Sequence, residues 1–252
     1  MRWPAEAIWE AVAPQLPGFT VEVLPEIDST NSELMRRARA GRTEPVLLVA
    51  ERQTAGRGRL GRTWASGQGD ALTFSLGLAI APADWSGLSL AVGVSLAESL
   101  HPDVRLKWPN DLWLDGRKLG GILIETASFA GDAALPRQAV IGVGLNIAPR
   151  PADGLSIPPA WLQERLPGLQ PGEALGRVVP PLVAAVQAFE ASGFSPFQLR
   201  YAARDLLRDR AVTLSDGRSG TAHGVTETGA LLVHTPQGMQ TVASAEVSVR
   251  PA

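Results

Sequence analysis

The residues best suited to chemistry form an arginine- and glycine-rich segment in the first third of the chain. Four arginines and no acidic residue stand between positions 52 and 62, namely Arg52, Arg57, Arg59 and Arg62. Glycines permit positive φ angles, and successive backbone N–H groups in such a loop can bind an anion. Guanidinium groups add forked donors that match carboxylates and phosphates. The segment therefore predicts a local anion-binding loop.

Residues 56–62 also fit the G-x-G-x-x-G pattern of dinucleotide-binding loops. That interpretation requires a helix directly after the loop, whereas residues 63–67 have no helical pattern. A solvated basic loop is the plain structural alternative. Trp64 argues against it, because an exposed loop rarely carries a tryptophan unless the ring packs on something. A loop that closes over an anionic ligand would also exclude water from a reactive intermediate.

A second group of polar residues flanks a predicted hairpin. Lys107, Asn110 and Asp111 lie where one strand ends. Lys118 begins the return strand after Asp115-Gly116, a strong hairpin signal. A lysine charge beside phosphates, a carboxylate and an amide donor together suit phosphoryl or nucleotidyl transfer. A surface hairpin with a weak salt bridge explains the same residues, so this pattern alone leaves both interpretations open.

A third feature is the pair of glycines in an apolar strand, Gly142 and Gly144, followed by Asn146. Glycine inside a strand marks either the close approach of another group or a β-bulge, and the pattern does not separate the two. The amide of Asn146 could read the edge of a nucleotide base.

These groups need a scaffold, and hydrophobic periodicity predicts its elements. Thr30 and Glu33 form a capping-box pattern at the start of one helix, which stops at Gly41. Strands joined by hairpins, without regular βαβ alternation, predict an α+β fold with a mixed sheet. Helices are predicted at residues 5–13, 30–39, 86–100, 173–191 and 196–207, and strands at 19–24, 46–50, 71–80, 104–108, 112–114, 119–125 and 140–147.

The C-terminal part has a different character. Its short apolar runs are separated by Asp216-Gly217, Thr228-Gly229 and Gln237-Gly238, which predicts a small β barrel or sandwich. We therefore expect two domains, residues 1–207 and residues 208–252.

Composition excludes several classes of protein. The chain of 252 residues has a net charge of −2 and a pI of 6.0, too acidic for a protein that coats nucleic acid. It has no cysteine, which excludes disulfides, thiol catalysis and thiolate metal sites. The three histidines lie far apart in the sequence. Without a signal peptide or a membrane-length apolar run, we expect a cytoplasmic protein that does not contact membranes.

Five motifs resemble those of biotin–protein ligases and follow one another along the chain in the same order as in that family. The resemblance covers roughly residues 25–150, and the C-terminal segment is similar to the SH3-like domain of that family. It implies an α+β, mixed-sheet catalytic domain of the biotin/lipoate ligase type followed by a small SH3-like β-barrel domain. The motifs are S-T-N at 29–31, G-R-G-R-x-G-R-x-W at 56–64, K-W-P-N-D at 107–111, K-x-x-G-I-L at 118–123 and G-x-G-x-N at 142–146.

The resemblance implies an ATP-dependent enzyme that attaches biotin to one lysine of a biotin carboxyl carrier domain through biotinyl-5′-AMP, with ATP bound as its Mg²⁺ complex. The implied catalytic residues are Lys118, Arg59 and Asp111. The implied biotin-binding residues are Ser29, Thr30, Asn31, Gln53, Arg57, Gly58, Arg59 and Lys118. The implied nucleotide-binding residues are Arg59, Arg62, Trp64, Lys107, Asn110 and Asn146. Asp111 would orient the incoming lysine or a metal ion, and no metal ligand is assigned.

Two departures from the family pattern bear on function. The common W-x-S-P run reads Trp64-Ala65-Ser66-Gly67 here, and loss of the proline should loosen the turn. Only residues 1–28 precede the S-T-N motif, too few for the winged helix of ligases that also repress transcription, so we expect no DNA-binding role.

Alternatives remain open. A lipoate–protein ligase shares the implied fold, and a nucleic-acid-binding module could use the arginine loop. An exposed edge of the sheet could pair two subunits into a homodimer or dock the carrier domain.

Overall fold

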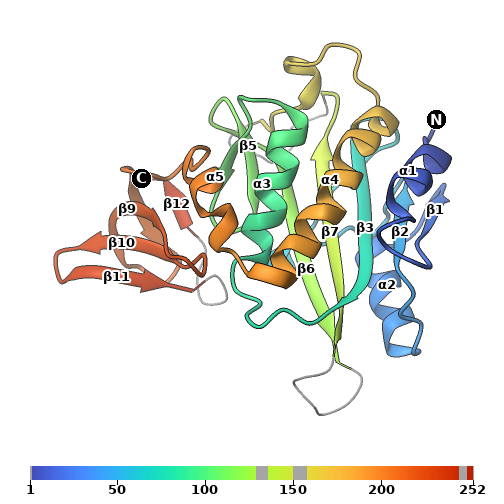
Figure 1. The fold of residues 1–252 in the computed structure, drawn as a ribbon. Helices are drawn as coiled ribbons and strands as arrows, with labels where there is room; N and C mark the ends of the chain where they lie inside the picture. The colour runs from blue at the N-terminus through green and yellow to red at the C-terminus, as the bar shows by residue number, and fades with distance from the viewer. Residues whose placement is uncertain (1, 129–135, 150–157, 244–248, 252) are drawn as a thin grey trace.

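The computed structural model describes residues 2–128, 136–149, 158–243 and 249–251, and its larger domain is built on one sheet (Figure 1). The strands of this sheet are β1 (Thr20–Leu24), β2 (Val46–Ala50), β3 (Ala71–Ile80), β4 (Arg105–Lys107), β5 (Asp111–Leu114), β6 (Arg117–Ala127) and β7 (Arg137–Asn146). They lie in the order β1-β2-β3-β7-β6-β5-β4. Only the β1–β2 pair among them is parallel, so the predicted mixed sheet is confirmed.

Helices cover the two faces of this sheet unequally. The α-helices are α1 (Ala5–Val12), α2 (Thr30–Arg39), α3 (Leu88–Leu100), α4 (Pro171–Ser192) and α5 (Gln198–Ala202). Helices α3 and α4 lie side by side across one face (Figure 1). Helix α2 packs against β3, β6 and β7, and the alternation of the strands shows that it does so on the other face.

The period-two alternation of strands decides which face is apolar. Leu72 and Phe74 of β3 belong to the main core with α3 and α4, whereas Thr73 and Ser75, which alternate with them, are small, polar and buried. Leu48 of β2 packs instead in a second cluster with residues of α2. Large side chains thus fill the space under α3 and α4, whereas the part of the opposite face formed by Thr73 and Ser75 carries small side chains.

One predicted helix is too long. The prediction at 196–207 becomes a short turn, Ser195–Phe197, followed by α5, which ends at Ala202. Beyond it the chain runs along β4, because Leu106 N donates to Arg204 O and Leu206 N donates to Leu106 O, both at 2.9 Å. These backbone bonds replace the helical ones, and tertiary pairing overrides the local periodicity.

The cap of α2 also differs from the prediction. The N-cap is Ser29, whose side chain accepts a hydrogen bond from Ser32 N at 3.4 Å. Glu33 pairs with arginines of its own helix instead of closing a capping box with Thr30. This shift by one residue leaves the hydroxyl and backbone N–H of Thr30 available to the site described below.

The C-terminal domain is an antiparallel sheet in the order β11-β10-β9-β8-β12. Its strands are β8 (Ala211–Leu214), β9 (Ser219–Val225), β10 (Leu231–Thr235), β11 (Gly238–Val242) and β12 (Val249–Pro251). Gly217, Gly229 and Gly238 have φ angles of 90°, 81° and 102°, which an L-residue rarely adopts. The predicted turns are therefore confirmed, whereas the boundary at 207/208 stays a prediction.

The two domains share one hydrophobic core. Val212, Ala222 and Val233 of the β domain belong to the same buried cluster as the helices and sheet of the larger domain. The indole N–H of the buried Trp108 donates to Gly229 O at 3.0 Å. The β domain therefore packs directly behind the strand-ending segment that contains Trp108.

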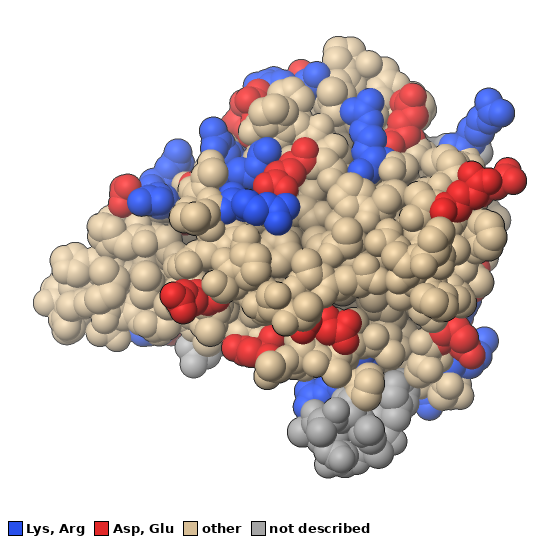
Figure 2. Space-filling view, viewed as in Figure 1, with Lys and Arg blue, Asp and Glu red and all other residues tan. Residues whose placement is uncertain are grey.

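Charged side chains lie in separate groups on the face of the molecule that α3 and α4 cover (Figure 2). Basic side chains gather there over α3 and α5, where Arg200 pairs with Glu98 at 2.6 Å. Within the described residues, no helix is both long enough and apolar enough to cross a membrane.

Candidate active site

A cavity of about 650 Å³ lies on the sheet face opposite α3 and α4. Its floor includes Thr73, Gly121, Leu123, Gly142 and Gly144, which alternate along their strands with residues of the main core. Because the three glycines have no side chain and that of Thr73 is small, the strands leave room for a ligand beside Leu123. Every predicted site residue except Asn146 lines this cavity: Ser29, Thr30, Asn31, Gln53, Arg57, Gly58, Arg59, Arg62, Trp64, Lys107, Asn110, Asp111 and Lys118.

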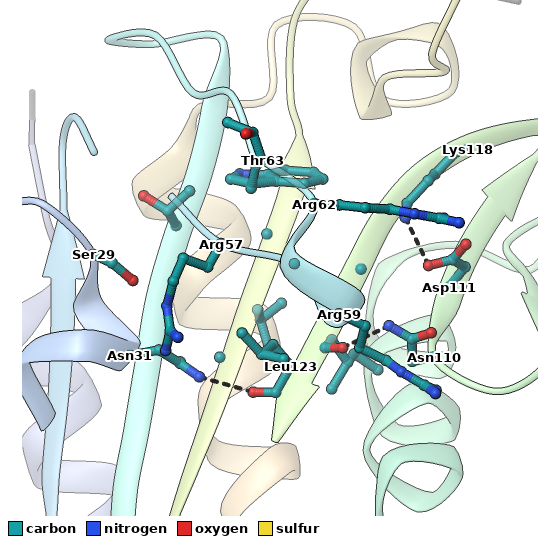
Figure 3. A pocket seen from close by; sticks show the side chains of 18 of the residues that line it. Ser29, Asn31, Arg57, Arg59, Arg62, Thr63, Asn110, Asp111, Lys118 and Leu123 are labelled. Atoms are coloured by element: carbon teal, nitrogen blue, oxygen red, sulfur yellow. Dashed lines mark hydrogen bonds and ion pairs between the residues drawn. The ribbon is translucent and has the colours of Figure 1, made fainter. Parts of the chain in front are cut away.

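The cavity has two chemically different ends (Figure 3). Ser29 and Asn31, at the start of α2, lie at one end together with Arg57. Arg59, Arg62, Asn110, Asp111 and Lys118 gather at the other end. A ligand that spans the cavity would therefore meet neutral donors and acceptors on one side and mostly cationic groups on the other.

The neutral end is a buried hydrogen-bond network. Thr30 N donates to Gln53 Oε1 at 2.8 Å. Ser75 Oγ lies 2.7 Å from Thr30 Oγ1 and 2.6 Å from Asn31 Oδ1. Asn31 Nδ2 donates to Leu123 O at 3.1 Å. Since each polar group is held by another, the network is rigid and suited to a small polar ligand group such as a urea.

The arginine loop is an ordered hairpin across residues 57–63. Its ends pair as antiparallel neighbours, and Gly58 N donates to Arg62 O at 2.7 Å. At the tip, Leu60 and Gly61 have φ angles of 55° and 72°, as a type I′ turn requires. The sequence did not predict this hairpin, because leucine is an unusual residue for that turn.

Arg59 is the half-buried member of the loop. Burial is the main cause that lowers the pKa of its guanidinium. The negative charge of Asp111 acts to raise this pKa, and the positive charge of Arg62 lowers it further. The cation remains charged, because an arginine pKa stays far above neutrality. A partly desolvated guanidinium close to a second one is a strong attractor for a phosphate or carboxylate.

The hairpin of β5 and β6 supplies the other charged groups. Lys118 Nζ lies 2.7 Å from Asp111 Oδ1, as strand pairing brings the two residues together. Lys107 Nζ lies 5.2 Å from the centre of the Trp113 ring. Asn110 Nδ2 donates to Ile122 O at 2.8 Å and so fastens the turn. These side chains line the cavity, while the ion pair of Lys118 with Asp111 is the one that the surface-hairpin alternative also expects.

The glycines of β7 make room for protein side chains. A β-carbon at Gly142 would lie 2.1 Å from Asn31 Oδ1, and one at Gly144 would lie 2.5 Å from Trp64 Cε2. The pairing of β7 with β3 and β6 is continuous in register. The β-bulge alternative is therefore wrong, and both glycines allow close approach.

Asn146 lies in a different place from the one expected. It is 1% exposed and does not line the cavity. Its Nδ2 donates to Ala160 O at 2.9 Å, which ties β7 to the segment that precedes α4. Its Oδ1 has no hydrogen-bond partner among the described residues, so this one acceptor is not engaged.

Gly67 stands where the family pattern often has proline, and its backbone stabilises the turn in another way. Its N–H donates to Asp70 Oδ1 at 2.8 Å, a bond that proline could not make because it has no N–H. The side chain of Asp70 thus fixes the turn in place of a ring.

The sequence patterns missed two polar residues at the neutral end. Ser75 lies on an alternating strand, where a small polar residue signals only a solvent-facing position. Glu125 accepts from Asn31 Nδ2 at 3.0 Å and pairs with Arg57 at 2.5 Å. An acid near a strand end resembles ordinary surface charge, so no sequence signal identified it.

The charge balance of the cavity is strongly positive. Among the described residues that line it, five are basic and Asp111 is the one carboxylate. In the same part of the chain, no group of three or more His, Cys, Asp or Glu is arranged to hold a metal ion. A divalent cation would therefore find one carboxylate here and would need ligand phosphates to complete its coordination.

Comparison with known families agrees with this architecture. The family described as "Biotin/lipoate A/B protein ligase family" matches residues 23–146, and "Biotin protein ligase C terminal domain" matches residues 210–250. The bifunctional ligase/repressor BirA of Escherichia coli is 39% identical over 249 residues, or 94% of this chain and 76% of that protein. A biotin–[acetyl-CoA-carboxylase] ligase of Paracoccus denitrificans is 32% identical over 240 residues, or 89% of this chain and 98% of that protein.

Solved structures show the same fold. The biotin protein ligase from Aquifex aeolicus in complex with biotin and ATP has a TM-score of 0.77 and 29% identity, over 92% of this chain and 99% of that one. Fold and matched domains define a protein of the biotin and lipoate ligase class. Within that class, the C-terminal domain and the relatives that match most of the chain show that it belongs to the biotin protein ligase family, and it is a ligase.

Proposed function

We propose that this ligase activates biotin with ATP as biotinyl-5′-AMP and then transfers the biotinyl group to one lysine of a biotin carboxyl carrier domain. The observation that carries the proposal is the pairing of two ends in one cavity. A buried network of neutral donors and acceptors lies beside Arg57, and a cationic group centred on Lys118 and Arg59 lies opposite.

In the first step, a carboxylate oxygen of biotin attacks the α-phosphorus of ATP, and the bond to pyrophosphate breaks. Two anions must approach each other, so the site must neutralise their charge in a water-poor environment. Lys118 is positioned to stabilise the charge that develops at the junction, and Asp111 at 2.7 Å holds its ammonium group in place. Arg59, Arg62, Lys107 and Asn110 would contact the phosphates.

In the second step, the neutral amine of the acceptor lysine attacks the carbonyl carbon of the mixed anhydride. The bond between that carbon and the phosphate oxygen breaks, and AMP leaves. Asp111 would orient the incoming amine, since its carboxylate is partly exposed to the cavity. The arginine hairpin would cover the adenylate until the acceptor arrives, which protects it from water.

The neutral end would bind the ureido group and ring of biotin. Ser29, Thr30, Asn31 and Gln53 present both donors and acceptors there. Trp64 would anchor the covering loop at Gly144.

Among the described residues that line the cavity, Asp111 is the single carboxylate, so these residues fit Mg²⁺ when it is bound to the phosphates of ATP. When bound, Mg²⁺ would neutralise phosphate charge. The protein groups would contribute binding, orientation and the exclusion of water.

The test is the formation of biotinyl-5′-AMP from biotin and [α-³²P]ATP, resolved by chromatography, with lipoate as the competing acid. Biotin-dependent label in the adenylate, unchanged by lipoate, supports the proposal. Label that depends on lipoate would favour the lipoate alternative, which the match to a biotin protein ligase C-terminal domain disfavours. The nucleic-acid alternative lacks support, since the arginines of the loop line a cavity.

Three further expectations from the sequence stay proposals: a cytoplasmic location, the absence of a DNA-binding role, and pairing of a sheet edge with a second subunit or with the carrier domain.

A further inference from the structure

Glu125 connects two elements that are far apart in the sequence. Its Oε2 pairs with Arg57 Nη2 of the arginine hairpin at 2.5 Å and accepts from Asn31 Nδ2 of α2 at 3.0 Å. One carboxylate oxygen therefore joins the loop over the cavity to the helix at its neutral end.

The position of Glu125 follows from the alternation of β6. Gly121 and Leu123 line the cavity, and Glu125 is the next residue of the same face. Continuous pairing with β7 places it opposite Val140, beyond the pair of Leu123 and Gly142. The side chain is 26% exposed, so the carboxylate lies at the rim, where the hairpin crosses.

The hairpin needs a counter-charge. It carries Arg57, Arg59 and Arg62 on a seven-residue segment that contains no acid, and these like charges repel one another when no anionic ligand is present. Its tip adds the strain of a leucine in the left-handed region, with φ 55°. The ion pair between Arg57, at the base of the hairpin, and Glu125 offsets part of this repulsion and strain.

We propose that Glu125 is a positioning residue that holds the arginine hairpin against α2 before any ligand binds. This inference deepens the proposed function and rests on it for the consequence that Glu125 slows the escape of biotin and of the adenylate. The side chain acts through Arg57 and Asn31.

Glu125→Gln is the variant of choice, because glutamine keeps the shape and still accepts from Asn31 while it removes the charge that Arg57 needs. Partly exposed ion pairs of this kind shift an equilibrium about two- to fivefold. The hairpin of the variant should therefore open about two- to fivefold more often.

Limited digestion of the ligand-free protein with trypsin measures this opening. Trypsin cleaves after arginine, and a tight hairpin is cut only when it opens. Cleavage after Arg59, followed by mass spectrometry, should be about two- to fivefold faster in Glu125→Gln than in the wild type. Glu98→Gln is the matched control, since it removes the same charge from a remote ion pair with Arg200, and its cleavage after Arg59 should equal the wild-type rate.

Arg57→Gln and the double variant test the pair itself. If Glu125 acts through Arg57, the double variant should be cut after Arg59 at the same rate as Arg57→Gln alone, so that Glu125→Gln has no further effect in that background. Additive rates would overturn the proposal, as would a wild-type rate in Glu125→Gln. Cleavage that rises at sites throughout the chain would also overturn it, because general unfolding would then be the cause.

A second measurement links the hairpin to the ligand. Release of preformed biotinyl-5′-AMP from Glu125→Gln should be faster by about the same factor, whereas release from the control Glu98→Gln should equal that from the wild type. A wild-type protein that forms no adenylate would contradict the proposed function and leave the digestion result intact. Equal release from the wild type and Glu125→Gln would overturn the positioning role alone.

Discussion

Lys118 and Asp111 form an ion pair of 2.7 Å inside the cavity, although seven positions separate them in the sequence. The turn at Asp115-Gly116 folds β6 back on β5 and brings the two side chains to the same end of the site. Asp111 thus holds the ammonium group of Lys118 in position inside the cavity.

We predict that Lys118→Ala loses adenylate formation about 10²–10³-fold, the size typical for removal of a preorganised charge. The fold should be retained, since the side chain is 42% exposed. Single-turnover formation of the labelled adenylate measures the rate. Arg52→Ala is the matched control, because Arg52 pairs with Glu26 away from the cavity, and its rate should match the wild type. Similar rates in Lys118→Ala and Arg52→Ala would remove Lys118 from its assigned role.

Gly142→Ala should damage the neutral end of the cavity. The added β-carbon would lie 2.1 Å from Asn31 Oδ1, so Asn31 must move and its bond with Ser75 is lost. We expect a destabilisation of about 1–3 kcal/mol and weaker binding of biotin, measured by urea unfolding and calorimetry. Gly176→Ala is the control, because its β-carbon meets Pro4 at 3.5 Å, an ordinary contact. Equal biotin affinity in both variants would contradict the account of the neutral end.

Trp108→Phe should loosen the contact between the two domains. It removes the buried hydrogen bond to Gly229 O, and an unsatisfied carbonyl costs about 1–3 kcal/mol. Trp113→Phe is a sharp comparison, since the indole N–H of Trp113 is buried without a partner among the described residues, and its loss removes no hydrogen bond. Thermal unfolding should show the larger loss for Trp108→Phe, and the reverse order would count against this contact.

We predict that acid weakens the ion pair between Asp28 and Arg36 at the start of α2. The hydrogen bonds from Arg36 are the main reason that the pKa of Asp28 falls from 3.8 to about 2. A lowered pKa means that this carboxylate stabilises the fold above pH 4 and stops doing so as the pH falls towards 2. The difference in Tm between the wild type and Asp28→Asn should therefore be present at pH 6 and shrink below pH 4. Because the pair is well exposed, its contribution should stay below about 1 kcal/mol. A difference that is constant from pH 6 to pH 2 would argue against the pair.

Much of the scaffold could be predicted, because it rests on periodicity. The strand at 71–80 and the helix at 30–39 have the predicted bounds, since the alternation of Leu72 and Phe74 and the stop at Gly41 are local signals. The helix predicted at 196–207 was too long, because backbone pairing with Leu106 depends on a strand about 100 residues away in sequence.

The site was predictable where residue type and motif coincide, as at Lys118 and Asn31. It was not predictable where a role depends on a distant partner. Nothing in the sequence near Glu125 shows that Arg57 and Asn31 both reach it. Likewise, the nearest neighbours of Asn146 give no sign that Ala160 O takes its amide N–H.

Transfer of biotin to an isolated carrier domain, followed by intact mass and peptide mapping, is the most direct test of the proposed reaction. With biotin and MgATP, we predict that one lysine of the carrier gains one biotinyl group, that omission of ATP abolishes the gain, and that Lys118→Ala slows it about 10²–10³-fold. A carrier that stays unmodified, although the folded wild-type protein binds both biotin and ATP, would contradict the account.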